Sequence, residues 1–327
     1  MTVPSPTVLL DPERAGVLLW AATLAPSLHN SQPWAFAFGP RHVEVYADAS
    51  RQLRNADPSG RSLLISCGAS VFNLRVAAGQ LGFHVQLRLL PEPIEPTLVA
   101  VAELDERQQP GGDLHGYFAA LPARRTNRHP FQARPIPHAV RTALIDAARA
   151  EGGVLHVFDD PDEVARIIDL LHDADIVDRT DPARLAERQK WVRDQSRGGG
   201  IPPASLGSTP TQQHTPFRDL DQPGVTRDYA TFETAPTLAV LSTSADRPVD
   251  WVRAGQALER LLLEATKAGI SASFLNQPLE QEDLRWLVRD PLTGVGHSHM
   301  ILRLGYGNEV PASPRRPVKE VRRAPKW

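Results

Sequence analysis

Residues 25–34 read APSLHNSQPW, a run of hydrogen-bonding side chains that is unusual directly after a helix. The preceding helix is predicted to begin at Asp11-Pro12-Glu13, because a carboxylate N-cap is followed by a proline in the first turn. Pro26 ends this helix, and the alternating residues 34–48 predict two strands around Gly39-Pro40. The run is therefore expected to be a loop that holds several hydroxyl and amide groups in place between a helix and a strand.

Two long stretches share one outline, a helix followed by a glycine and a strand. The first is the apolar run of residues 61–81, which ends at Gly82, and the second is residues 250–269. This echo favours an internal duplication, although the same order of elements also arises by convergence.

The region between these stretches contains a long aperiodic segment. Residues 161–195 are predicted to be helical and charged, but periodicity fails from Ser196 to about Arg227, where Gly, Pro, Ser, Thr and Gln dominate. A loop of this length inside a compact domain is typical of a lid, a binding loop or a disordered insert.

Composition excludes several classes of protein. The chain has 327 residues with 41% hydrophobic content, enough for a core in one large domain or two fused ones. A net charge of -2 argues against a nucleic-acid binder, and the basic tail PRRPVKEVRRAPKW is too short to change this. The single cysteine, Cys67, is expected to be a small buried hydrophobe in a cytoplasmic protein. We see neither a signal peptide nor an apolar run of about 20 residues, so no membrane association is expected.

Several common active-site motifs are missing. The sequence has no Gly-x-Gly-x-x-Gly after a strand, no phosphate-binding P-loop and no Gly-x-Ser-x-Gly elbow. His297 and His299 would share a strand face, but no third metal ligand is evident, so no metal site is predicted.

Two features remain, the polar loop and the arginine clusters at residues 124–128 and 315–316. Amide and hydroxyl groups in fixed geometry, with arginines for a phosphate, suit a phosphorylated heterocycle such as flavin mononucleotide (FMN). The alternatives are a solvated, salt-bridged arginine surface and a purely structural turn.

These segments resemble known motifs. APSLHNSQPW resembles the FMN-binding loop of the nitroreductase family, and ARRTNRHPF resembles that family's Arg-Arg-Ser/Thr-x-Arg-x-Phe motif, with one extra residue between Arg128 and Phe131. LGYGNEVPASPRRPVKEV resembles the end of the family's chains. The loop lies about a hundred residues before the arginines, an order that resembles the Acg subfamily, in which two nitroreductase-like halves are fused.

The resemblance implies an α+β fold with three α/β/α layers and two halves that form a pseudo-dimer. Residues 1–115 would form the first half, with the loop at 25–34. Residues 116–327 would form the second, with the arginine motif, a lid insert at about 196–227 and the basic C-terminal tail. One complete loop and one arginine motif imply one FMN per chain and no need for a partner chain to complete the site.

The resemblance also assigns residues to the cofactor but none to catalysis. Backbone groups of residues 273–276 would meet the flavin ring. The predicted FMN-binding side chains come from both halves: Ser27, His29, Asn30, Gln32, Pro33, Trp34, Arg124, Arg125, Arg128, Arg315 and Arg316.

The function implied is an NAD(P)H-dependent oxidoreductase that reduces nitroaromatics or quinones through FMN in a ping-pong cycle. The alternative is a protein that stores FMN under a fixed lid with little turnover, because fold alone does not establish activity.

Overall fold

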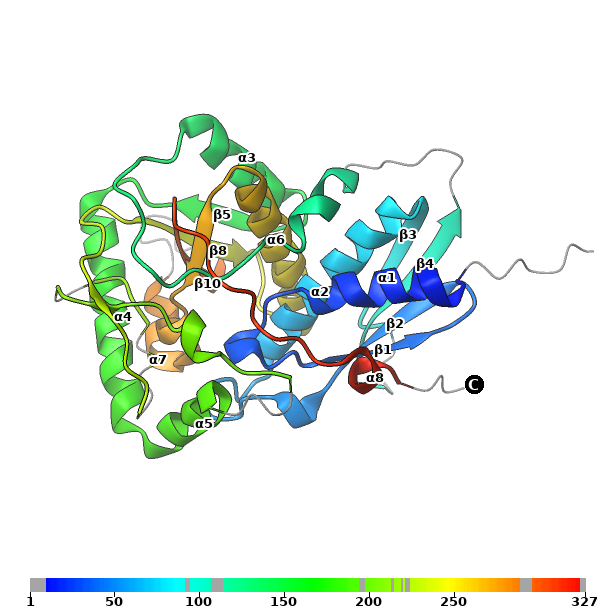
Figure 1. The fold of residues 1–327 in the computed structure, drawn as a ribbon, viewed down its shortest axis with the longest axis horizontal. Helices are drawn as coiled ribbons and strands as arrows, with labels where there is room; N and C mark the ends of the chain where they lie inside the picture. Colours follow the sequence, from blue (N-terminus) through cyan, green and yellow to red (C-terminus); the bar gives the residue numbers. More distant parts are fainter. Residues whose placement is uncertain are drawn as a thin grey trace, which may run out of the picture.

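The computed structural model describes residues 10–91, 95–106, 114–193, 198–212, 215–218, 220, 224–288 and 296–323. Two four-stranded antiparallel sheets and a set of long helices form most of this part of the chain (Figure 1). The predicted α+β class is confirmed.

The first sheet and its helices come from the N-terminal part of the chain. Asp11 caps the first helix by accepting a hydrogen bond from the Arg14 amide (2.8 Å). Gly82, with φ 82°, follows the second helix, as expected. The strands pair in the order β1-β2-β4-β3. The elements are α1 (Pro12–Thr23), η1 (Leu28–Asn30), β1 (Trp34–Phe38), β2 (His42–Ala47), η2 (Ala49–Arg51), α2 (Arg61–Gln80), β3 (Phe83–Leu89) and β4 (Leu98–Glu106).

The second sheet repeats this order with different residues. Its strands pair as β5-β8-β10-β9, so a helix, two strands, a helix and two strands follow one another in both parts of the chain. The repeated elements are α3 (His138–Arg149), β5 (Val154–Val157), β8 (Thr237–Thr243), α6 (Pro248–Lys267), β9 (Ser271–Phe274) and β10 (His297–Gly305).

A long insertion interrupts the second unit between β5 and β8. In the first unit the corresponding strands, β1 and β2, are joined by the short turn at 39–41. The insertion therefore spans residues 158–236, and it is longer than the lid insert expected at about 196–227. Its helical part consists of two helices that meet at Asp181-Pro182, where the Asp181 carboxylate accepts from the Ala183 amide (2.8 Å). The insertion contains α4 (Pro161–Thr180), α5 (Pro182–Arg193), η4 (Pro203–Ser205), β6 (Thr209–Pro210) and β7 (Tyr229–Ala230).

Short elements complete the described chain. They are η3 (His115–Ala120), η5 (Gln277–Glu280), α7 (Glu282–Arg285), η6 (Trp286–Val288) and α8 (Val318–Val321).

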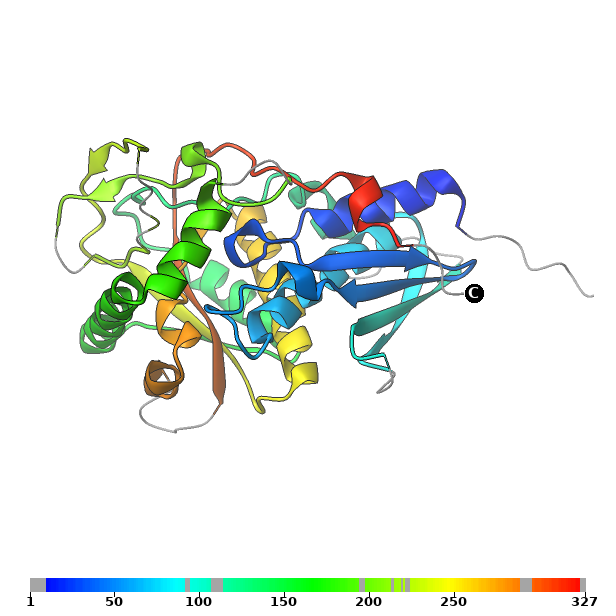
Figure 2. The ribbon, with the colours of Figure 1, turned by 90° about the horizontal axis from the view of Figure 1, so that it is seen from below.

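The helices and sheets are layered differently in the two units. Leu241 and Leu302 face α3 and α6, whereas Leu238 and Ile301 on the same strands face Ile167 of α4, so the second sheet has helices on both faces. In the first unit, α1 and α2 cover one face of the sheet. The last described segment (red in Figures 1 and 2) crosses from β10 to β1, where the Arg323 amide donates to the Phe36 carbonyl (2.7 Å).

The two units meet where α2 and α6 cross at two glycines. A Cβ atom added to Gly68 would lie 2.1 Å from the Val252 carbonyl oxygen, and one added to Gly255 would lie 2.0 Å from the Ile65 carbonyl oxygen. Only glycine allows the two backbones to approach this closely.

Helix α2 is also the one described helix that is long and apolar enough to cross a membrane by length and composition. The expectation that no apolar run reaches the length of a membrane helix is therefore wrong for Arg61–Gln80. However, 78% of its most apolar window is buried inside the protein, as in the core helix of a folded domain, and Cys67 is fully buried there, as predicted.

We predict that Gly68→Ala lowers the free energy of unfolding by about 3 kcal/mol or more, because the new methyl group would overlap backbone atoms that cannot move independently. Gly79→Ala in the same helix is the matched control, since no atom lies within 4 Å of its added Cβ. Gly79→Ala should leave the free energy of unfolding unchanged or raise it slightly. Urea unfolding of both variants tests this, and equal stabilities would contradict a tight crossing.

Candidate functional site

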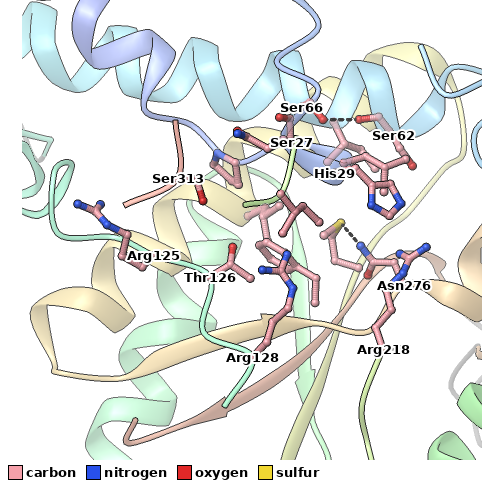
Figure 3. Close-up of a pocket in the computed structure, with 18 of the residues that line it drawn as sticks. Ser27, His29, Ser62, Ser66, Arg125, Thr126, Arg128, Arg218, Asn276 and Ser313 are labelled. Atoms are coloured by element: carbon pink, nitrogen blue, oxygen red, sulfur yellow. Dashed lines mark hydrogen bonds between the residues drawn. The ribbon is translucent and has the colours of Figure 1, made fainter. Parts of the chain in front are cut away.

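A cavity lies between the two units, bounded by the crossing helices and the insertion. Its empty volume is about 970 Å³, part of it open to solvent. Figure 3 shows side chains from distant parts of the chain pointing into it. The wall combines the polar loop, α2, the arginine motif, the insertion, α6, β9, β10 and the C-terminal segment: Pro26, Ser27, Leu28, His29, Asn30, Ser62, Ile65, Ser66, Arg124, Arg125, Thr126, Arg128, Ile201, Arg218, Leu220, Leu258, Phe274, Asn276, Met300, Ser313 and Arg315.

The polar loop has an unusual backbone. His29, Asn30 and Gln32 have φ of 47°, 55° and 49°, in the left-handed region that side chains other than glycine seldom adopt. The Ser27 hydroxyl stabilises this course by accepting from the Gln32 amide (2.9 Å). Such strain persists only where the surrounding contacts impose it, and it is common at ligand-binding sites.

Asn30 connects the loop to two later segments. Its side-chain amide donates to the carbonyl oxygens of Gly200 and Pro314, each at 2.9 Å. The loop is thereby joined both to the insertion and to the basic C-terminal segment.

Three predicted loop residues, Ser27, His29 and Asn30, line the cavity. The other three, Gln32, Pro33 and Trp34, are buried outside its lining. Trp34 belongs to the core of the first unit. Gln32 donates to the Gly198 carbonyl (2.8 Å) and accepts from the Arg316 amide (2.8 Å), so its observed contacts hold the loop, the insertion and the tail together.

Four of the five predicted arginines line the cavity: Arg124, Arg125, Arg128 and Arg315. Arg316 lies outside the lining. Its guanidinium donates to the carbonyl oxygens of Gln32 (3.0 Å) and Trp34 (3.2 Å) and so stabilises the backbone where β1 begins. The structure therefore brings the loop and both arginine clusters together; their contacts with FMN stay predictions.

Sequence reasoning missed several wall residues. Arg218 is an isolated arginine in the aperiodic insertion, and no local pattern marked it. Ile201 and Leu220, also from the insertion, contribute apolar surface, and Ser62 and Ser66 come from the first turns of α2.

The charge of the wall is one-sided. Among the described residues, five guanidinium groups and no carboxylate line the cavity. Burial, followed by Arg124 and Arg125, lowers the pKa of Arg315 to about 9. Burial, followed by Arg218, lowers the pKa of Arg128 to about 10. Since crowded buried cations destabilise one another, the cavity favours an anionic ligand.

His29 is a neutral group in this wall. Burial, followed by Arg218 and other arginines, lowers its pKa well below the ordinary 6.5. The imidazole therefore offers hydrogen bonds without charge at neutral pH, and its Nδ1 is buried without a hydrogen-bond partner among the described residues.

Glu259 lies beneath the arginines on α6 and is fully buried. One carboxylate oxygen lies 3.5 Å from Arg124 Nε, an ion-pair contact without a hydrogen bond. Burial raises the pKa of Glu259 to about 7, although Arg124 opposes the shift.

The two strand histidines differ in their surroundings, and His299 is the buried one. Thr243 Oγ1 and His299 Nε2 lie 2.6 Å apart, and burial, followed by Arg61 and Arg285, lowers the pKa of His299 to about 3. No cluster of three or more His, Cys, Asp or Glu residues suitable for a metal occurs within the described ranges.

We predict that Glu259 makes the ligand-free protein less stable as the pH rises from 4.5 to about 7. Because its folded pKa lies above the ordinary 4.5, the folded state binds the proton more tightly, and that stabilisation is lost as the pH passes the folded value. Relative to wild type, Glu259→Gln should be more stable at pH 8 than at pH 5 by about 3 kcal/mol. Urea unfolding at both pH values measures this. The exposed Glu282→Gln is the control, and parallel curves for Glu259→Gln and wild type would contradict the prediction.

The chain is similar to known proteins over most of its length. The model of the nitroreductase family matches residues 121–306, from just before Arg124 to the end of the second sheet. The chain is 29% identical to "Putative NAD(P)H nitroreductase Rv3131" of Mycobacterium tuberculosis over 95% of this chain and 91% of the relative. It is 30% identical to "Uncharacterized protein Rv3127" of the same organism over 92% and 90%.

Another relative carries the subfamily name itself. "Putative NAD(P)H nitroreductase acg" of M. tuberculosis is 29% identical over 98% of this chain and 97% of the relative. A solved nitroreductase with bound FMN from Bacteroides fragilis aligns with 59% of this chain and 89% of its own at 16% identity and a TM-score of 0.37. With the family model covering more than half of its residues, this chain belongs to the nitroreductase family and is an Acg-like member of it.

Proposed function

We propose that the protein binds one FMN per chain and acts as an NAD(P)H-dependent oxidoreductase on nitroaromatics or quinones. The observation that carries the proposal is the convergence of the polar loop and four predicted arginines on one cavity, whose lining in the described part of the chain contains no carboxylate. Family membership supports the same assignment.

The residues present fit an FMN molecule. Arg124 and Arg315 both donate to the Leu24 carbonyl (3.2 and 2.9 Å), so their guanidinium groups lie together beside Arg125 and would hold the phosphate. Polar side chains for a heterocycle and apolar surface for a flat ring occur in the same wall: Ser27, Asn30, Ser66, Asn276, Ile65, Leu258 and Met300.

When bound, FMN supplies the redox chemistry, by accepting a hydride from a nicotinamide and returning electrons to an acceptor in a ping-pong cycle. The net reaction is NAD(P)H + H⁺ + R–NO₂ → NAD(P)⁺ + R–NO + H₂O, or the two-electron reduction of a quinone to a hydroquinone. The chain contributes buried positive charge, positioning and exclusion of water. No side chain is assigned as a catalytic acid or base.

The repeated fold supports one site per chain. We assign residues 1–115 and 116–327 to two duplicated halves, so the turn after α3 would correspond to the loop after α1. That turn is short, and Glu151 within it pairs with Arg75 (2.5 Å) and Arg260 (2.9 Å). In the proposed duplication these ion pairs would occupy the position of a second loop, which supports a single site built from one chain.

FMN storage is the second candidate function, and the attachment of the insertion favours it. Asn30 and Gln32 hold Gly200 and Gly198, and Arg128 Nη1 donates to the Ser205 carbonyl (2.8 Å). A Cβ on Gly207 would lie 2.4 Å from the Arg128 carbonyl oxygen, so the insertion packs directly on the arginine motif. A lid fixed in this way would retain FMN and exclude nicotinamide.

Arg124→Ala combined with Arg125→Ala should weaken FMN binding by about 3 kcal/mol, roughly a hundredfold in Kd, because charge-assisted phosphate contacts are lost. Fluorescence titration with FMN measures this. Arg134→Ala is the control, since Arg134 lies over the Tyr306 ring, outside the cavity. A double variant that purifies with a full complement of FMN would contradict the assignment.

Anaerobic mixing of the FMN-loaded protein with NADH or NADPH separates the two candidate functions. Loss of the flavin absorbance at roughly 450 nm within seconds indicates an oxidoreductase. Reduction by dithionite alone indicates a storage protein. The untreated holoprotein under the same conditions is the control for slow photoreduction.

A further inference from the structure

Glu259 is a buried carboxylate that the proposed function does not use. It lies on α6 behind the arginines of the cavity wall, with none of its surface exposed. Neither of its oxygens accepts a well-formed hydrogen bond within the described ranges, and its ion-pair contact is the one with Arg124 Nε at 3.5 Å. A carboxylate taken out of water is costly unless it is both paired and hydrogen-bonded, so the charge of Glu259 is only partly compensated.

The groups that face Glu259 come from three segments. The arginine motif presents Arg124 and the C-terminal segment presents Arg315, and these two cations favour its ionised form. Helix α2 presents Asn73, which is fully buried and whose side-chain oxygen and nitrogen have no well-formed hydrogen bond to a described residue. An amide offers a donor to a carboxylate and an acceptor to a carboxylic acid, so Asn73 suits both protonation states.

Other charged groups along this side of α6 have partners of their own. Arg75 and Arg260 both pair with Glu151 (2.5 and 2.9 Å). The Tyr117 hydroxyl of η3 faces Glu264. Helix α3 and the second sheet contact α6 through apolar side chains. The cations that balance the buried carboxylate are therefore those of the cavity wall.

Arg124 lies between this carboxylate and the cavity. It lines the cavity and shares the Leu24 carbonyl with Arg315 (3.2 and 2.9 Å). The two guanidinium groups that balance Glu259 are thus two of those proposed to hold the FMN phosphate. A phosphate monoester bound there brings about two negative charges to cations that already face a carboxylate. Buried like charges disfavour each other's ionised form and are poorly screened by salt.

We propose that Glu259 takes up a proton from solvent when the FMN phosphate binds, which makes the retention of FMN pH-dependent. The inference rests on the proposed function in that the phosphate lies against Arg124 and Arg315. The proton goes to a carboxylate oxygen of Glu259, and the neutral carboxyl group can donate to the Asn73 side-chain oxygen. The two guanidinium groups then balance the phosphate alone.

The direction of the pH dependence follows from the ligand-free protein. Burial raises the pKa of Glu259 to about 7, so at lower pH the carboxyl group is largely neutral and the phosphate meets no competing charge. At higher pH each FMN that binds requires a proton from solvent, so Kd increases with pH. FMN should bind about fivefold more weakly at pH 8 than at pH 7.

Two other titrating groups contribute little in this pH range. A phosphate monoester has a second pKa of about 6, so the phosphate is already a dianion at pH 7. Burial lowers the pKa of Arg315 to about 9, so Arg315 is still largely protonated at pH 8.

Isothermal titration calorimetry of FMN into the flavin-free full chain measures the proton. Titrations at pH 7.5 in HEPES and in Tris, whose ionisation enthalpies differ, give the number of protons bound from the difference in heat. We expect uptake of about half a proton or more per FMN. Riboflavin, which lacks the phosphate, should bind without proton uptake. Equal uptake with both flavins would overturn the proposal.

A variant assigns the proton to Glu259. Glu259→Gln keeps the shape of the side chain but cannot take up a proton, so the uptake should disappear and Kd should be nearly constant between pH 7 and pH 8. The exposed Glu282→Gln is the control and should behave like wild type. Unchanged uptake in Glu259→Gln would assign the proton to another group and refute the inference.

Failure of this inference is distinguishable from failure of the proposed function. Wild-type protein that binds no FMN at pH 6.5, where Glu259 is already largely neutral, would refute the proposed function and the inference with it. FMN binding without proton uptake would refute the inference alone, because the cofactor would then bind while Glu259 keeps its charge. If Glu259→Gln fails to fold, the comparison of FMN with riboflavin in wild type still decides.

Discussion

The arrangement of the whole molecule depends on the contact between Gly68 of α2 and Gly255 of α6. Because neither residue has a Cβ atom, the two helix backbones lie close enough for the units to share one interior. Ile65 and Leu258, on the faces of these helices, form part of the cavity wall. Loop 25–34 lies just before the sheet of the first unit, and the arginine motif lies just before α3 of the second unit. Because the crossing of α2 and α6 joins the two units, it brings both segments to the same cavity.

Among the described residues, arginines line the cavity and several of their carboxylate partners lie behind its wall. Guanidinium groups face the interior, and carboxylates that compensate them, including Glu259 and Glu280, lie behind the wall. The protein is thereby assembled with an electropositive cavity before any ligand binds, at the expense of lowered pKa values for Arg128 and Arg315. An anionic ligand relieves this repulsion, which links ligand binding to stability.

The insertion has a double role in this architecture. It supplies Ile201, Arg218 and Leu220 to the wall, and it is held by the same loop and arginine residues that would bind FMN. The proposed oxidoreductase activity would require these hydrogen bonds to open for a nicotinamide, which depends on the relative free energies of the closed and open states. Gln32 and Arg316 lie outside the cavity lining but also help to hold the insertion. The Arg316 amide donates to the Gln32 side chain, which in turn donates to the Gly198 carbonyl of the insertion.

Local sequence was sufficient for the main elements. The cap at Asp11, the glycine at 82, the apolar helix 61–80 and the strong helix 248–267 are encoded by short-range signals, and the polar loop and arginine motifs were recognisable from residue type and spacing. Tertiary structure alone decided which of those side chains face the cavity, because burial of Gln32 and Arg316 depends on segments nearly three hundred residues apart in the chain. It also decided the position of Arg218, since an isolated arginine in an aperiodic segment has no local signal, and its hydrogen bonds to Glu280 hold it in the cavity wall.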